Sequence, residues 1–230
     1  MTRKKYKDIS PEEAVDIQKK LKTEIETKPL EKEPNTVAGA DISFDRGSEV
    51  VHAAIIVLSL SDLEPVARSL VTAPMSFPYI PGLLAFREMP ALLKAWDQLS
   101  KKPDVLIMDG HGLAHPRRMG IATHFGIEAD HPTMGCAKNI LTGTHQELGM
   151  EKGATSDLLD EGEKVGLALR SRTNVNPIYI SPGHKLSFEN TYDILMKVLT
   201  KYKLPKTTRL AHCWANKLRK GNVESGFFEF

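Results

Sequence analysis

The sequence predicts an α/β fold, in which helices flank a mixed central sheet built from an antiparallel meander and parallel strands. Three strand-like runs, at residues 37–44, 50–60 and 64–72, are joined by short polar turns, which is typical of a meander. Residues 104–109 form a short apolar run after a helical segment and so indicate a buried parallel strand. Because helical patterns alternate with the later strands, we expect helices on the faces of one sheet.

The first helix is expected to begin after Ser10, since a serine cap, Pro11 and Glu13 form a capping-box pattern, and to end near Thr27. A second helix is expected over residues 89–99, with Pro90 in its first turn. The remaining pattern predicts helices over residues 121–129, from a Ser187 cap to Lys201, and from a Thr207 or Thr208 cap to Leu218. It also predicts strands over residues 133–137, 164–172 and 177–180, a surface excursion over 143–163, and a turn from Ser181 to His184.

The composition is that of a globular chain, with 230 residues of which 41% are hydrophobic. No run of about 20 apolar residues occurs, so we expect no membrane span, and polar residues 1–5 indicate no secretory signal. With only Cys136 and Cys213, we expect reduced thiols and neither a disulfide framework nor a structural zinc site. The expectation is a cytoplasmic protein of one domain over residues 1–230, with an N-terminal helix packed on it within residues 1–30 and a tail at 221–230.

Local basic patches are needed for any contact with nucleic acid, because the formal net charge is only +2. Arg117 and Arg118 end a glycine-rich loop that includes Gly112 and His115, and its amides could contact phosphate or an extruded base. The alternative is a surface turn with two solvated arginines. Lys138, which follows a predicted strand, is either a phosphate contact or an ordinary exposed lysine. The other basic candidates are Lys217, Arg219 and Lys220.

A stiff aromatic segment lies between the meander and the second helix, where Pro78 and Pro81 bracket Tyr79 and Ile80. Each proline restricts its own φ and disfavours a helical conformation in the residue before it. A glycine follows, which lets the chain turn into a helix, and Glu88 comes shortly after. A rigid wedge beside an acid suits an enzyme that extrudes a base and cuts the strand next to it. Taken alone, the pattern favours an ordinary proline-bracketed loop whose tyrosine packs on the surface.

Two further acids strengthen the enzymatic interpretation. Asp41 lies inside the first predicted strand, and Asp109 ends the buried one. A buried carboxylate is costly unless it is paired or binds a metal, and the end of an α/β sheet is where such groups converge. Together with Glu88, and with no Cys/His set nearby, these acids suit a hard cation such as Mg²⁺ or Mn²⁺. Separately, Asp41 could be an edge or turn residue, and Asp109 a helix cap or turn opener.

The histidines indicate no zinc site. His111 and His115 have helical spacing, but Gly112 and Pro116 interrupt a helix there, and the metalloprotease glutamate is missing. His212 lies in the last predicted helix, beside an apolar stripe. It is either a satisfied boundary residue or a group that orients phosphate or water, or shuttles a proton.

Several motifs follow one another in a characteristic order, at residues 39–44, 78–88, 109–118, 135–138, 181–184 and 208–212. In this order the chain resembles the endonuclease V family, the deoxyinosine 3′ endonucleases of the RNase H-like superfamily. The resemblance extends over about residues 37–219. The ordered set is more specific than any single motif, because the proline-bracketed segment and the Asp-Gly-His-Gly loop are both unusual. The resemblance therefore implies an RNase H-like sheet.

The resemblance also implies roles for individual residues. Asp41, Glu88 and Asp109 would form a metal-dependent centre, in which Asp41 and Asp109 bind Mg²⁺ directly and Mn²⁺ can substitute. His212 would complete this centre, and Lys138 would reach the scissile phosphate. The proline-bracketed segment would fill the gap left by a flipped hypoxanthine. The expected DNA contacts are Pro78, Tyr79, Ile80, Pro81, Gly82, Arg87, Gly112, His115 and Lys138.

The implied reaction is hydrolysis of the second phosphodiester bond 3′ to deoxyinosine in DNA, leaving 3′-hydroxyl and 5′-phosphate ends. Two other interpretations stay open: cleavage of inosine-containing RNA, and a non-catalytic module that binds damaged DNA. The aromatic tail, with Phe227, Phe228 and Phe230, would either dock on a sliding clamp or pack as an ordered C-terminus. The absence of the usual glutamine favours packing.

Overall fold

The computed structural model describes Tyr6 and residues 9–230, so the N-terminal residues 1–5, on which the secretory-signal prediction depends, lie outside the described part. The strands are β1 (Thr36–Ser43), β2 (Val50–Ser59), β3 (Pro65–Pro74), β4 (Val105–Asp109), β5 (Thr133–Ala137), β6 (Thr155–Asp160), β7 (Glu163–Leu169), β8 (Ile178–His184) and β9 (Gly226–Glu229). The helices are α1 (Pro11–Leu21), α2 (Leu84–Gln98), α3 (Ile121–Ala129), α4 (Phe188–Val198) and α5 (Lys206–Arg219), with a short 3₁₀ helix, η2 (Lys22–Glu24), after α1.

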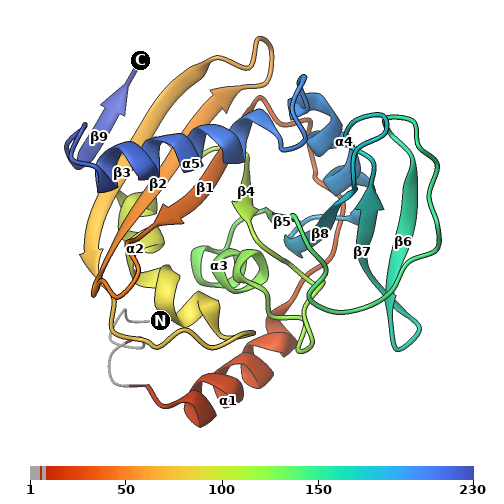
Figure 1. Ribbon diagram of the computed structural model, residues 1–230, viewed down its shortest axis with the longest axis horizontal. Coiled ribbons are helices and arrows are strands. Elements are labelled where there is room, and N and C mark those ends of the chain that lie inside the picture. Colours follow the sequence, from red (N-terminus) through yellow and green to blue (C-terminus); the bar gives the residue numbers. More distant parts are fainter. Residues whose placement is uncertain (1–5, 7–8) are drawn as a thin grey trace.

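One nine-stranded sheet runs through the molecule in the order β6-β7-β8-β5-β4-β1-β2-β3-β9 (Figure 1). β1, β2 and β3 pair as an antiparallel meander, whereas β4 lies parallel to both β1 and β5. The predicted fold class, a mixed sheet with an antiparallel meander and parallel strands flanked by helices, is confirmed. Among the described residues, no helix has the length and apolar character needed to cross a lipid bilayer.

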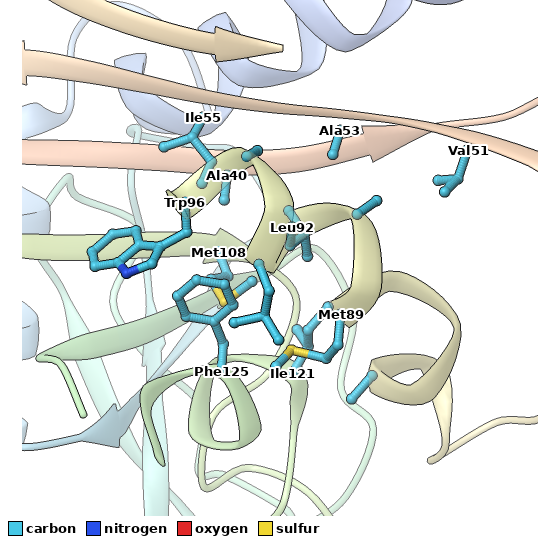
Figure 2. Close-up of a cluster of buried hydrophobic side chains, with 14 of the residues drawn as sticks. Ala40, Val51, Ala53, Ile55, Met89, Leu92, Trp96, Met108, Ile121 and Phe125 are labelled. Carbon is cyan, nitrogen blue, oxygen red and sulfur yellow. The ribbon is translucent and has the colours of Figure 1, made fainter. Parts of the chain in front are cut away.

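The two faces of the sheet carry different helices, because successive side chains of a strand point to opposite sides. On one face, α2 packs on β2 and β3 and α3 packs on β5 and β8. The two helices meet there, and Figure 2 shows Leu92 and Met89 of α2 near Phe125 of α3. On the other face, Ile56 and Ile107 pack with residues of α4 and α5. Both faces of β1 and β4 are therefore covered, and functional groups on these strands can reach solvent only at the strand ends.

Helix α5 lies unusually close to β1. A Cβ atom placed on Gly39 would lie 2.3 Å from the backbone carbonyl carbon of Thr207. Thr207 and Thr208 are buried in this contact, within the first turn of α5. The prediction that one of them caps the helix is therefore wrong: the N-cap is Pro205. The close approach brings the exposed side of α5 to the end of β1.

Helix α2 begins earlier than predicted. It starts at Leu84 rather than near Met89, and it contains Pro90 in its interior. A proline there costs the helix about 3 kcal/mol or more. Its apolar side, which buries Phe86, Met89 and Leu92 among others, offsets that cost by burial. As a result Glu88 lies on a helix and not on a loop.

Other differences concern element limits. Helix α1 has the predicted capping box, with Glu13 N donating to Ser10 Oγ at 3.2 Å, but it ends at Leu21. The predicted turn from Ser181 to His184 is part of β8, because its backbone pairs with β5. The predicted excursion over 143–163 contains β6, which pairs with β7. The tail forms edge strand β9 against β3, as expected for a packed C-terminus.

Replacing Gly39 with alanine should lower the free energy of unfolding by about 2–3 kcal/mol, because the new methyl group overlaps the backbone of α5. Gly47→Ala is the matched control: its Cβ meets open space and only its positive φ of 81° is unfavourable, at about 1 kcal/mol. Urea unfolding of both variants measures the difference. Equal losses would show that the contact between β1 and α5 is not close in solution.

Candidate active site

Two carboxylates lie where the parallel pairing of two neighbouring strands stops. β1 and β4 pair in register up to Ala40 and Met108, and Asp41 and Asp109 come one residue later on each strand. Both side chains are half-buried. Burial and the nearby carboxylate of Asp109 raise the pKa of Asp41 to about 6, although hydrogen bonds from His212 and the Ile42 amide oppose the shift. The sheet therefore brings two like charges together at its end.

A polar chain along α5 holds Asp41 from the side. His212 Nδ1 donates to Asp41 Oδ2 at 2.7 Å, and His212 Nε2 lies 2.9 Å from Asn216 Nδ2. Asn216 Oδ1 in turn accepts from Ser43 Oγ at 2.9 Å and from Arg219 at 3.3 Å. With Nδ1 donating to Asp41 and Nε2 accepting from Asn216, both ring nitrogens have a partner and the ring orientation is determined.

Glu88 approaches the same pair from helix α2. Burial raises the pKa of Glu88 to about 8, and the charges of Asp41 and Asp109 add to the shift. Glu88 and Asp109 also line the same hollow. The structure thus brings together the three acids that the sequence indicated, from two strands and one helix.

The three acids fit a divalent cation by their chemistry. Among the residues described, no three His, Cys, Asp or Glu side chains are already close enough to form a metal site. Instead, each aspartate has a partner within the protein: His212 hydrogen-bonds to Asp41, and Lys138 Nζ lies 3.2 Å from Asp109 Oδ2. Carboxylates whose pKa rises through mutual repulsion are stabilised in the charged form by a nearby cation, and oxygen donors suit Mg²⁺ or Mn²⁺.

A broad groove lies beside Asp109 and His212 on the side of α5. This outer groove has a volume of about 420 Å³. Four basic side chains and one histidine lie in its lining, namely Lys138, Arg209, Lys217, Lys220 and His212. The positive lining next to the acids suits the phosphate backbone of a nucleic acid.

A narrower hollow lies on the other side of Asp109. This inner pocket has a volume of about 90 Å³, and Gly82, Glu88, His111 and Ile121 line it together with Asp109. Burial lowers the pKa of His111 to about 4, so its ring is neutral near pH 7. Its buried Nδ1 atom has no hydrogen-bond partner among the described residues. The pocket wall therefore presents a neutral imidazole beside the carboxylates.

The proline-bracketed segment projects at the rim of the inner pocket. Tyr79 is 64% exposed, whereas Ile80 packs partly against the core beneath it. Gly82 follows with φ of 80°, a conformation that glycine adopts readily, and helix α2 begins two residues later. The segment therefore presents one exposed aromatic ring on an anchored base, and the wedge stays a prediction.

The carbonyl oxygen of Gly82 anchors this wedge from below. It accepts hydrogen bonds from Gln18 Nε2 at 3.0 Å and Arg117 Nη2 at 2.8 Å, and it lies 3.0 Å from His115 Nε2. Gln18 belongs to α1 and is fully buried, so the N-terminal helix does more than cover the sheet. Nothing in the sequence around Gln18 indicated this role, because its partner lies 64 residues away.

Several residues expected on the DNA surface turn inward. His115 is only 2% exposed and contacts Gly82. Arg87 donates to the Phe77 carbonyl at 3.1 Å, and Gly112 is packed against Pro182 of β8. These three residues thus support the site from within. Lys138, Pro78, Tyr79 and Pro81 are exposed.

Arg118 is also not a surface residue. It is buried and pairs with Asp160 at 2.6 Å and Glu163 at 2.8 Å, which ties the glycine-rich loop to the β6–β7 hairpin. Neither a phosphate contact nor a solvated arginine describes it. Sequence reasoning also missed Asn216, although its spacing of four residues from His212 on a predicted helix was a usable signal.

The comparisons with known proteins agree with this geometry. The family model for endonuclease V matches residues 19–213. The endonuclease V of Myxococcus xanthus is 44% identical over 96% of this chain and 95% of its own length. A crystal structure of endonuclease V from Streptomyces avermitilis has a TM-score of 0.88 and 36% identity, covering 93% of this chain and 95% of that one.

A second similar structure contains nucleic acid. It is endonuclease V of Ciona intestinalis in complex with a 24mer DNA containing an inosine followed by a ribo-adenosine. Its TM-score is 0.80 at 26% identity, covering 92% of this chain and 98% of that one. Family match, identity and coverage agree, and this chain is a member of the endonuclease V family of nucleases.

Proposed function

We propose that this chain is a Mg²⁺-dependent endonuclease that recognises deoxyinosine in DNA and hydrolyses the second phosphodiester bond on its 3′ side, leaving 3′-hydroxyl and 5′-phosphate ends. The observation that carries the proposal is the meeting of Asp41, Glu88 and Asp109 at the sheet end, between an inner pocket and a basic outer groove. Nucleases of this family depend on a metal, and a related enzyme has been crystallised on inosine-containing DNA.

The acids would hold the cation in this proposal. Asp41 and Asp109 would be its direct ligands, and Glu88 would complete the negative site. When bound, the cation would activate water and stabilise the leaving oxygen of the phosphodiester. His212 would keep Asp41 oriented, because its ring is held on both nitrogens.

Lys138 would contact the scissile phosphate. Its ammonium group already lies 3.2 Å from Asp109, so a phosphate bound beside that carboxylate is within reach of the lysine. The lysines and arginine of the outer groove would hold neighbouring phosphates. Such contacts position the strand and carry no sequence information.

The wedge and the inner pocket would select the lesion. Hypoxanthine opposite thymine pairs poorly, so extrusion costs less there than at a normal base pair. Tyr79 would stack on the exposed neighbours, a contact worth about 1–3 kcal/mol. The extruded base would enter the inner pocket, whose wall includes His111.

A cleavage assay tests the proposal directly. End-labelled oligonucleotides that differ only in one position, adenine, deoxyinosine or ribo-inosine, are incubated with Mg²⁺ or with EDTA. We expect a cut only with deoxyinosine and Mg²⁺, at the second phosphodiester on the 3′ side. Preferential cleavage of the ribo-inosine strand would instead assign the protein to RNA. Tight binding of deoxyinosine without scission would assign it to the non-catalytic class.

Asp109→Asn should reduce cleavage by about 10³-fold or more, since it removes one charge from the metal site while keeping the shape of the side chain. Binding to deoxyinosine DNA should stay within a few fold of wild type. Asp157→Asn, at an exposed position in β6, is the control and should cleave normally. Single-turnover rates and fluorescence anisotropy measure the two effects. Full activity of Asp109→Asn would refute the metal assignment.

Tyr79→Ala should weaken binding to deoxyinosine duplex about 5- to 100-fold, because the stacking contact is lost. Binding to undamaged duplex should change much less. Tyr79→Phe keeps the ring and is expected to bind almost as wild type does. If both duplexes lose affinity equally in Tyr79→Ala, the residue is a scaffold and not a wedge.

Stability without divalent cations should fall as the pH rises from about 4 to 8. The raised pKa values of Asp41, about 6, and Glu88, about 8, mean that the folded state binds more protons than the unfolded state across this window. Glu88→Gln should therefore raise the Tm in EDTA at pH 8 by about 2–4 °C or more, while cleavage is lost.

Two further measurements complete this pH experiment. Mg²⁺ at pH 8 should stabilise the wild type more than Glu88→Gln, because ligand binding to the folded state raises its stability. Exposed Glu224→Gln should leave the pH profile unchanged. A wild-type Tm in EDTA that rises from pH 5 to 8 more steeply than that of Glu88→Gln would contradict the proposed carboxylate repulsion.

A further inference from the structure

A third hollow adjoins the site, beyond Lys138. It has a volume of about 470 Å³ and lies where β5 and β8 end against the loop that precedes β6. Lys138, His145, Tyr179 and Lys203 line it, and these four residues define what we call the distal groove. None of the roles assigned above to the wedge, the acids or the inner pocket uses His145, Tyr179 or Lys203.

The three hollows are consecutive. Asp109 lines both the inner pocket and the outer groove, and Lys138 lines both the outer groove and the distal groove. A strand whose lesion lies in the inner pocket would pass the acids and then reach the distal groove. Because the proposed cut lies on the 3′ side of the lesion, the part of the strand beyond Lys138 is its 3′ continuation.

The lining of the distal groove matches the parts of a nucleotide. The rings of His145 and Tyr179 have centroids 5.7 Å apart at 46°, which gives an aromatic platform. Tyr179 pairs across the sheet with Ala137, the neighbour of Lys138, so this platform adjoins the catalytic lysine. Lys203 adds a cation, and its charge reaches Cys136 at the end of β5. Aromatic side chains on which bases can stack, next to a basic side chain, are how proteins bind single strands without reading sequence.

The groove is also held in shape before any ligand arrives. Arg170 is buried and donates to the carbonyls of Leu148, Gly149 and Val175, at 3.3, 3.0 and 2.8 Å. These bonds secure the far end of the loop that carries His145. Arg170 hydrogen-bonds to the loop and is left out of the charge count. Lys138 and Lys203 then outweigh Glu147, so the net charge of the lining is positive. A preformed site loses less entropy when it binds.

We propose that the distal groove binds the substrate strand on the 3′ side of the cut, with a base stacked on the His145–Tyr179 platform and a phosphate on Lys203. The inference rests on the proposed function and extends it to the length of strand that the enzyme recognises. It makes the 3′ flank of the lesion, and not only the lesion, a determinant of how well a strand is cut.

A tail-length experiment tests this inference. Single strands with one deoxyinosine and a constant 5′ side are made with a short 3′ tail, a long 3′ tail, and a long tail of abasic nucleotides. Cleavage with Mg²⁺ gives kcat/KM for each strand. In the wild type, the long tail should increase kcat/KM by roughly 5- to 100-fold over the short tail, and the abasic tail should recover only a small part of this gain.

Variants assign the gain to the groove. Tyr179→Leu and His145→Ala should each lose most of the gain, and Tyr179→Phe should keep it. The two platform variants are independent, because His145 lies on a loop and Tyr179 on a strand. Lys203→Ala should reduce the gain and lower the salt dependence of binding by about one phosphate contact. Lys201→Ala, at an exposed position close by in the chain, is the control and should keep the full gain.

The outcomes separate this inference from the proposed function. A gain that is absent in the wild type, or that survives in Tyr179→Leu, His145→Ala and Lys203→Ala alike, would overturn the assignment of the groove. A full gain with the abasic tail would overturn the stacking contact. If no deoxyinosine strand is cut whatever its tail, the proposed function itself is wrong.

Discussion

The parallel pairing of β1 with β4 is the constraint on which the rest of the site depends. Its register places Asp41 and Asp109 side by side, where the covered faces of the sheet leave only the strand ends open. Two buried like charges destabilise each other, and Glu88 adds a third. His212 hydrogen-bonds to Asp41, and Lys138 forms an ion pair with Asp109. These two contacts partly offset the repulsion among the three carboxylates.

Helix α5 connects the stability of the fold to the orientation of this site. Its buried side rests on β1 at Gly39, and its exposed side carries His212 and Asn216. Arg219, at its last residue, pairs with Asp45 and donates to Ser43 Oγ, which fixes the end of the helix to the strand that bears Asp41. The same contact between a strand and a helix therefore determines both packing and the direction of the imidazole. Groups held by rigid elements in this way are positioned more accurately than groups on loops.

The wedge is held by a different part of the chain. The Gly82 carbonyl collects side chains from helix α1 and from the glycine-rich loop, so three distant segments converge below one exposed tyrosine. Burial lowers the pKa of His115 to about 4, so the ring in this cluster is neutral at physiological pH. A rigid base matters for the proposed wedge, because a flexible segment would lose more conformational entropy when it stacks on a base. The inward-facing residues His115 and Gly82 thus have contacts within the protein that support this segment.

The sequence by itself determined the meander, the buried parallel strand, the capped first helix and the three acids, because these follow from local periodicity, caps and the cost of isolated buried charges. It did not determine the limits of α2, where tertiary burial outweighs the penalty of Pro90, nor the strand β8 in place of a turn, where pairing with β5 decides. Only the tertiary structure showed that Arg118 is buried in an ion-pair network and that Gln18 holds the wedge, since their partners are distant in sequence. The distal groove likewise forms where β5, β8 and a loop come together, and local sequence patterns do not predict contacts between such distant segments.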